Sequence, residues 1–210
     1  DLGDGRVFKY AKAGSSGISA GKLNVAAAID AAHIDGYPET AISVGDKVVQ
    51  IHVTAGTALA ANQLKGGFLQ INDGTGQGEQ YAIESNTALG ASGTSLWLSL
   101  ADPMKTALAA SNANEVTLVH NPQYAVVEST TQASRPTGVP AVDVTAAYYF
   151  WNQVYGEANV LMDGTPAVGS QLTIGGVSGA VKVMATPYVQ PLVGEKFGNA
   201  GVDTEYKPVF

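Results

Sequence analysis

Three histidines, His33, His52 and His120, are the side chains of this 210-residue chain best suited to acid–base or metal chemistry. An imidazole changes charge near neutral pH and binds transition metals. Each histidine stands alone in the sequence, and the chain has no cysteine. Zinc sites and catalytic motifs place such residues at short, fixed spacings, although a zinc triad assembled across the fold is the alternative. We therefore expect surface or hydrogen-bonded histidines, and predict no catalytic residue, no metal site and no cofactor.

A run of alternating glycines, Gly74, Gly76 and Gly78, follows a predicted strand. A phosphate-binding loop needs the amide groups of a helix N-terminus behind it, and no helix is expected after this run. The flanking Asp73 and Glu79 could contribute carboxylates to a Ca²⁺ site, but their spacing matches no EF-hand loop. The run therefore predicts the loop of a β-hairpin.

The charge balance excludes one large class of partner. Lys and Arg number 11 against 18 Asp and Glu, which gives a net charge of −7, and only 14% of the residues are charged. Binding to a phosphate backbone requires clustered Lys and Arg, and no such cluster is present. No apolar run approaches the ~20 residues of a membrane-spanning helix. We expect neither a nucleic-acid nor a membrane partner.

The elements that would position any site are short strands. Apolar and β-branched runs recur about every ten residues between turn-forming residues, which is typical of small barrels and sandwiches. Residues 68–84 predict a hairpin, and Asp102-Pro103 predicts a short helix over residues 103–110. Residues 22–33 fit a helix and a strand equally well. The fold class expected is mainly β: two small β-barrel or sandwich modules, an extended N-terminal arm and one or two short helices.

Composition shifts divide the chain into three parts. Residues 1–20 are rich in Gly and Ser and predict an extended arm, with Val7, Phe8 and Tyr10 as its anchors. Residues 21–122 are expected to form an N-terminal β module, and residues 123–210 a C-terminal β-barrel module.

The most informative segment is the aromatic run at residues 147–156. On a strand, Tyr149 and Trp151 share one face, and Tyr148 and Phe150 share the other. Packing into the core is the simplest explanation for two aromatic faces. The functional alternative is an aromatic edge buried against a partner, because Tyr and Trp are favoured in interfaces. With Tyr155 and the anchors of the arm, these residues define the candidate interface: Val7, Phe8, Tyr10, Tyr149, Trp151 and Tyr155.

Several short blocks from about residue 45 to residue 210 resemble the capsid decoration (cement) proteins of tailed phages. They are GGFLQIND (66–73), GEQYAI (78–83), LSLADP (98–103), GVP (138–140), YFWNQVYG (149–156), GAV (179–181), VG (193–194) and EYKPV (205–209). The segment 124–210 is also similar to the small barrel of lambda-type head decoration proteins. The family has no catalytic residues to transfer to this chain.

The resemblance implies a structural virion protein on the outer surface of the capsid. It would bind the major capsid protein and itself, as a homotrimer that bridges capsomers and stabilises the head against the pressure of packaged DNA. A phage tail-fibre, adhesin or carbohydrate-binding β domain, with Trp97 and Trp151 as sugar-stacking platforms, is the alternative. A virion-associated glycan hydrolase is a third, which would need a cleft with paired carboxylates.

Overall fold

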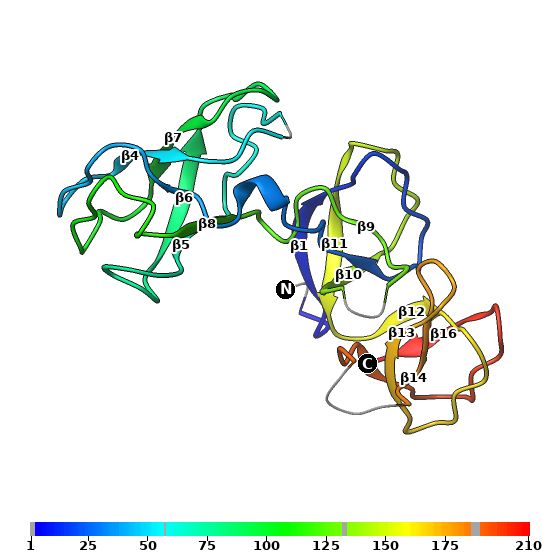
Figure 1. Ribbon diagram of the computed structural model, residues 1–210. Helices are drawn as coiled ribbons and strands as arrows, with labels where there is room; N and C mark the ends of the chain where they lie inside the picture. Colours follow the sequence, from blue (N-terminus) through cyan, green and yellow to red (C-terminus); the bar gives the residue numbers. More distant parts are fainter. Residues whose placement is uncertain (1–2, 57, 132–133, 186–189) are drawn as a thin grey trace. The chain divides into compact units, whose positions relative to one another are not determined.

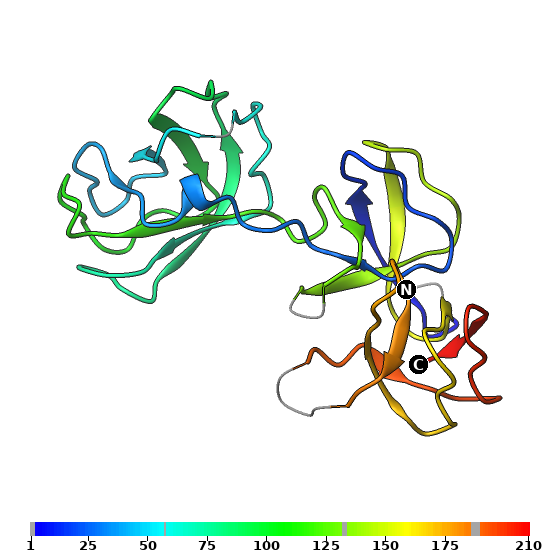
Figure 2. The ribbon, with the colours of Figure 1, turned by 45° about the vertical axis from the view of Figure 1, so that its right-hand side comes forward.

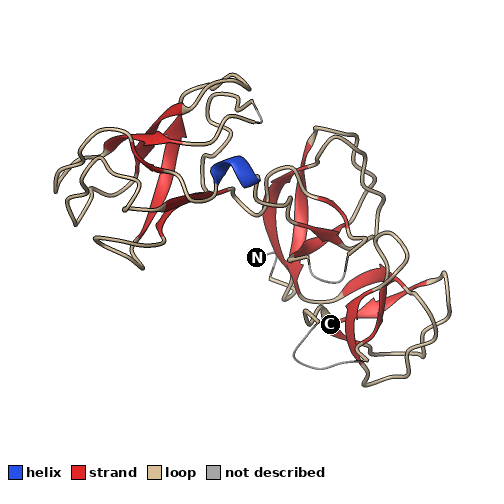
Figure 3. Cartoon of the chain, in the orientation of Figure 1, coloured by secondary structure: helices blue, strands red, loops and turns tan. Residues whose placement is uncertain are grey.

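The computed structural model describes residues 3–56, 58–131, 134–185 and 190–210. Throughout these residues the secondary structure consists of short strands and a single 3-10 helix, η1 (Ala31–His33), as Figure 3 shows. The predicted mainly β fold is confirmed. The chain forms two compact units: an inserted unit, Ile29–Asn121, and a discontinuous unit made of Asp1–Ala28 and Pro122–Phe210.

The inserted unit is built on one antiparallel sheet of six strands, in the order β3-β4-β7-β6-β5-β8 (Figure 1). The strands are β3 (Tyr37–Pro38), β4 (Val48–His52), β5 (Phe68–Ile71), β6 (Gln80–Asn86), β7 (Ser95–Leu100) and β8 (Val116–Val119). A bridge between Gly36 and Val116 joins the two edges of the sheet, and the Val116 N–H donates to the Gly36 carbonyl at 2.7 Å. The sheet therefore curls toward closure, which protects its edges from pairing with other chains.

Strict alternation on β7 illustrates why this sheet forms. Leu96, Leu98 and Leu100 point inward and are at most 1% exposed, whereas the intervening Ser95, Trp97 and Ser99 face outward. A period of two places one set of side chains on each face of a strand. The inward leucines join a single apolar core that extends over all the strands from β4 to β8.

The discontinuous unit contains one five-stranded sheet, in the order β1-β11-β10-β2-β9, and two smaller sheets, β12-β16 and β14-β13-β15. Its strands are β1 (Val7–Lys12), β2 (Asn24–Val25), β9 (Val127–Glu128), β10 (Pro136–Pro140), β11 (Tyr149–Tyr155), β12 (Ala158–Leu161), β13 (Gln171–Ile174), β14 (Val181–Val183), β15 (Gly194–Glu195) and β16 (Tyr206–Val209). Two separate apolar clusters serve as cores here.

The N-terminal segment is not the extended arm that the sequence predicted. β1 pairs with β11 from Val7↔Tyr155 to Lys12↔Tyr149, and the two strands run side by side in Figures 1 and 2. At its end, the Lys12 carbonyl accepts from the Val126 N–H at 3.0 Å. The backbone groups of β1 that face β11 are satisfied within the chain, and β1 forms the edge strand of its sheet. The structure thus groups residues 1–28 with residues 122–210, in place of the expected segments 1–20, 21–122 and 123–210.

Local predictions met different outcomes. The hairpin is confirmed, since β5 and β6 pair antiparallel around the glycine run. The helix over residues 103–110 is wrong: Met104 and Leu108 are buried in the core, and Leu108 forms a bridge with Ile42. Here burial of apolar side chains outweighs a favourable helix start. Residues 22–33 contain both the short strand β2 and the helix η1.

Candidate functional site

Three aromatic side chains lie together on the outer face of the β1–β11 pair. Tyr10 is directly opposite Trp151 in the register, and Tyr149 lies opposite Lys12. The Tyr10 and Tyr149 rings stack with centroids 5.2 Å apart, and the Tyr10 and Trp151 rings meet in an edge-to-face arrangement with centroids 5.4 Å apart. Tyr10 is 58% exposed, Tyr149 55% and Trp151 63%. We call Tyr10, Tyr149 and Trp151 the aromatic face.

A cation lies beside this aromatic face. The Lys12 Nζ is 5.5 Å from the centroid of the Tyr149 ring and 5.0 Å from that of Tyr124. An ammonium group over an aromatic ring is attracted by the ring quadrupole. The arrangement combines exposed apolar area with one positive charge, on a chain whose net charge is negative.

The structure brings together half of the predicted interface residues. Tyr10, Tyr149 and Trp151 form the aromatic face, whereas Tyr155 lies at the other end of β11, 61% exposed, with its ring 5.9 Å from Phe210. Val7 and Phe8 are half-buried.

The strand β11 has two unlike faces. Phe150 and Asn152 point inward and are 7% and 0% exposed, while Tyr149 and Trp151 point outward. The sequence offered core packing and an aromatic interface edge as alternatives. The strand combines both, because one face packs into a core and the other displays aromatic rings on the surface.

A buried polar network supports β11 from the inside. The Asn24 and Asn152 carboxamides donate to each other, each at 3.0 Å. The Thr137 hydroxyl donates to the Asn24 Oδ1 at 2.6 Å, and the Asn152 Nδ2 also donates to the Gln123 Oε1 at 2.9 Å. Buried polar groups joined in this way fix one arrangement of the strands, because any other leaves them without partners. The network therefore holds β11 in the register that aligns the aromatic face.

Sequence reasoning missed this network. Asn, Thr and Gln are common turn and surface residues, so their presence carried no signal. The one usable indication was Asn152, which falls in the inward series of β11 with Phe150 although it is polar.

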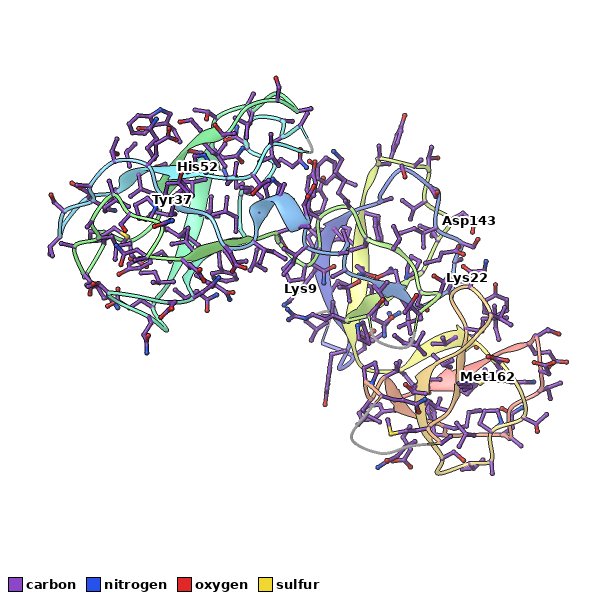
Figure 4. All side chains as sticks on the ribbon, viewed as in Figure 1. Lys9, Lys22, Tyr37, His52, Asp143 and Met162 are labelled. Atoms are coloured by element: carbon purple, nitrogen blue, oxygen red, sulfur yellow. The ribbon has the colours of Figure 1, made fainter. Side chains whose placement is uncertain are left out.

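The histidines do not assemble into a triad. The His33 and His120 ring centroids lie 5.7 Å apart, whereas the His52 ring stacks on Tyr37 with centroids 4.4 Å apart. Tyr37 and His52 are labelled next to each other in Figure 4. His33 is 1% exposed, and neither of its ring nitrogens has a hydrogen-bond partner among the described residues. The expected surface or hydrogen-bonded histidine is thus wrong at this position. Burial lowers the pKa of both His33 and His120, and Asp30 opposes this only in part.

The other candidates for metal chemistry are occupied by internal contacts. Glu79 accepts hydrogen bonds from the hydroxyl groups of Thr106 and Tyr81, which hold the pKa of its carboxyl below the usual range. Asp73 accepts from the Gly74 N–H at 2.7 Å within the hairpin loop. Within the described ranges, no three His, Asp or Glu side chains lie close enough together to hold a metal ion.

Comparisons of the chain with known protein-family models, with curated proteins and with solved structures return no match. Over the part of the chain that the structure describes, no helix has the length and apolar character needed to cross a membrane. The aromatic face, with three adjacent exposed rings, is the surface feature best suited to binding a partner.

Proposed function

We propose that this protein is a structural virion protein that binds the outer surface of a tailed-phage capsid through the aromatic face. The observation that carries the proposal is that three adjacent aromatic side chains on the paired strands β1 and β11 are each more than half exposed. Interface cores are enriched in Tyr and Trp, and hot-spot residues cluster. Exposed aromatic rings that already contact one another also lose little side-chain freedom on binding.

The low charge and the pairing of β1 with β11 support an attachment role. A platform on paired strands keeps its shape when it binds, so less free energy is lost in ordering it. The resemblance of the sequence blocks to capsid decoration proteins leads us to propose the major capsid protein as the partner and a homotrimer that bridges capsomers. Several modest contacts in one trimer would give tight attachment, because each contact raises the effective concentration for the next.

The test is binding to undecorated tailed-phage capsids, measured by co-sedimentation and by imaging, with the mass of the free protein determined in parallel. We expect wild-type protein to decorate the shell and Trp151→Ala to weaken binding at least tenfold. Trp97→Ala is the matched control, because Trp97 is also exposed but lies in the inserted unit. Wild-type protein that stays off every shell would overturn the proposal, and a monomeric mass would exclude the trimer.

A further inference from the structure

A cleft of about 550 Å³ lies in the discontinuous unit and contains none of the three residues of the aromatic face. Residues from β10, β11, β12 and β16 line it, together with the N-terminal segment. Its volume falls within the range of about 300–1,000 Å³ that is typical of small-molecule sites.

One wall of the cleft is an aromatic ring that packs directly against a glycine. Tyr206 is 41% exposed, and its ring packs against Gly21 so closely that a Cβ at that position would lie 2.7 Å from two ring carbons. Gly21 also has a φ of +71°, which favours glycine. Both constraints select glycine at position 21, and the absence of a side chain there leaves room for the Tyr206 ring.

Three side chains of the cleft offer hydrogen-bond acceptors to a ligand. Gln153 is 7% exposed, and its Nε2 donates to the carbonyls of residues 155, 156 and 157 at 3.3, 3.2 and 2.7 Å. These bonds fix the carboxamide, while its Oε1 receives no hydrogen bond from the described residues. Asp143, labelled in Figure 4, accepts from the Ala20 N–H through Oδ1 at 2.8 Å, which anchors a second acceptor group. Glu157 adds a third.

The charge of the cleft limits the ligand class. Arg6 is the one cation among the lining residues, and its guanidinium is already paired with Asp4 at 2.7 Å. The carboxylates of Asp143 and Glu157 therefore leave the cleft with a net negative charge. An anionic ligand would be repelled. A ligand rich in hydroxyl groups would donate to the acceptors of Gln153, Asp143 and Glu157, and its C–H face could pack on the electron-rich face of Tyr206.

We infer that this cleft binds a neutral sugar, of mono- or disaccharide size. Tyr206 supplies the apolar wall, and Gln153, Asp143 and Glu157 accept hydrogen bonds from the sugar hydroxyls. This binding does not depend on attachment to a capsid, because the aromatic face does not line the cleft.

The experiment is saturation-transfer NMR on the full chain, with glucose, galactose, mannose, N-acetylglucosamine and their disaccharides as probes, followed by titration of the sugars that bind. We expect at least one neutral sugar to bind. Tyr206→Leu should weaken it at least tenfold, whereas Tyr206→Phe keeps the ring and should change affinity less than threefold. Tyr148→Leu is the control, because Tyr148 is also exposed, at 66% against 41% for Tyr206, but lies outside the cleft. Thermal unfolding checks that each variant is folded.

Absence of binding by every sugar in the panel would overturn the inference. Binding that survives unchanged in Tyr206→Leu would also overturn it, since the sugar would then occupy another surface. Trp151→Ala separates the two proposals: it should weaken capsid binding at least tenfold and leave sugar affinity as in the wild type.

Discussion

The two units use the same short antiparallel strands but fill their interiors differently. Among the residues that the structure describes, the inserted unit has one core cluster of 17 buried apolar residues, whereas the discontinuous unit has two clusters, of nine and six. Beside the smaller clusters it buries the network of Asn24, Thr137 and Asn152. Apolar burial stabilises without direction, while a hydrogen-bond network selects one register.

This difference explains where the exposed aromatic residues are found. On β7 of the inserted unit, large apolar side chains point inward and one Trp is exposed. On β11, an Asn occupies an inward position, and Tyr149, Trp151 and Tyr155 are displayed outward. The discontinuous unit thus places large aromatic surface where it contributes little to folding, as expected for residues retained for binding.

The largest effect should come from the apolar core. Leu96→Ala removes a side chain that is 0% exposed and should lower the free energy of unfolding of the inserted unit by about 3–4 kcal/mol. Each unit contains one tryptophan, Trp97 or Trp151, so denaturation followed by fluorescence in a Trp151→Phe background reports the inserted unit alone.

The control for this variant is Val48→Ala, at a 59% exposed position of the same sheet, which should cost less than about 0.5 kcal/mol. In a Trp97→Phe background, the remaining Trp151 reports the discontinuous unit, which Leu96→Ala should leave unchanged. Equal destabilisation of both reporters would show that the units unfold together and would break the comparison.

The second effect tests the polar network. Asn152→Ala leaves Asn24 and Gln123 without the hydrogen bonds that Asn152 makes and should destabilise the discontinuous unit by about 2–3 kcal/mol. Denaturation monitored at Trp151 gives the value. Asn24→Ala combined with Asn152→Ala should cost less than the sum of the single variants, because both break the same bonds. Additive effects would show that the two carboxamides act separately.

The third effect is a loss of folding stability in acid. Between pH 6.5 and 5, the free energy of unfolding should fall in the inserted unit and not in the discontinuous unit. All three histidines lie in that unit, and burial lowers the pKa of His33 and His120 below the ordinary 6.5. The unfolded state therefore binds more protons, and stability is lost as the pH falls below about 6.5. Each proton taken up on unfolding contributes about 1.4 kcal/mol per pH unit.

Denaturation monitored at Trp97 over this pH range measures the loss. His33→Phe keeps an aromatic ring at the buried position and should flatten the pH profile, while Trp151 should report no comparable change in the wild type. A profile that is equally steep in His33→Phe would assign the effect to other groups.

The sequence predicted what depends on neighbours in the chain. Turn residues and alternation gave the mainly β fold and the hairpin around Gly74. They could not give the pairing of β1 with β11, since Tyr10 and Trp151 are separated by 141 positions and no local pattern encodes their contact. The helix over residues 103–110 failed for the same reason: the distant partner of Leu108, Ile42, decides the local conformation.

The candidate site was predicted only in its parts. Aromatic residues at alternating positions marked Tyr149 and Trp151, and Tyr10 was selected as an anchor. Their meeting on one face, and the support from Asn152 and Asn24 on the other, required the three-dimensional register.

The smallest loss of stability is expected for Trp151→Ala, and comparing it with Phe150→Ala distinguishes the two faces of β11. Phe150 and Trp151 are neighbours in sequence, but Phe150 is 7% exposed and Trp151 63%. Phe150→Ala should cost about 3 kcal/mol or more, whereas Trp151→Ala should cost about 0.5 kcal/mol or less, because its ring is mostly in water in the folded state. Chemical denaturation of the two variants, followed by far-UV circular dichroism, checks the ranking. A Trp151→Ala variant as unstable as Phe150→Ala would mean that the aromatic face is part of the core, and its exposure would then no longer support a binding role.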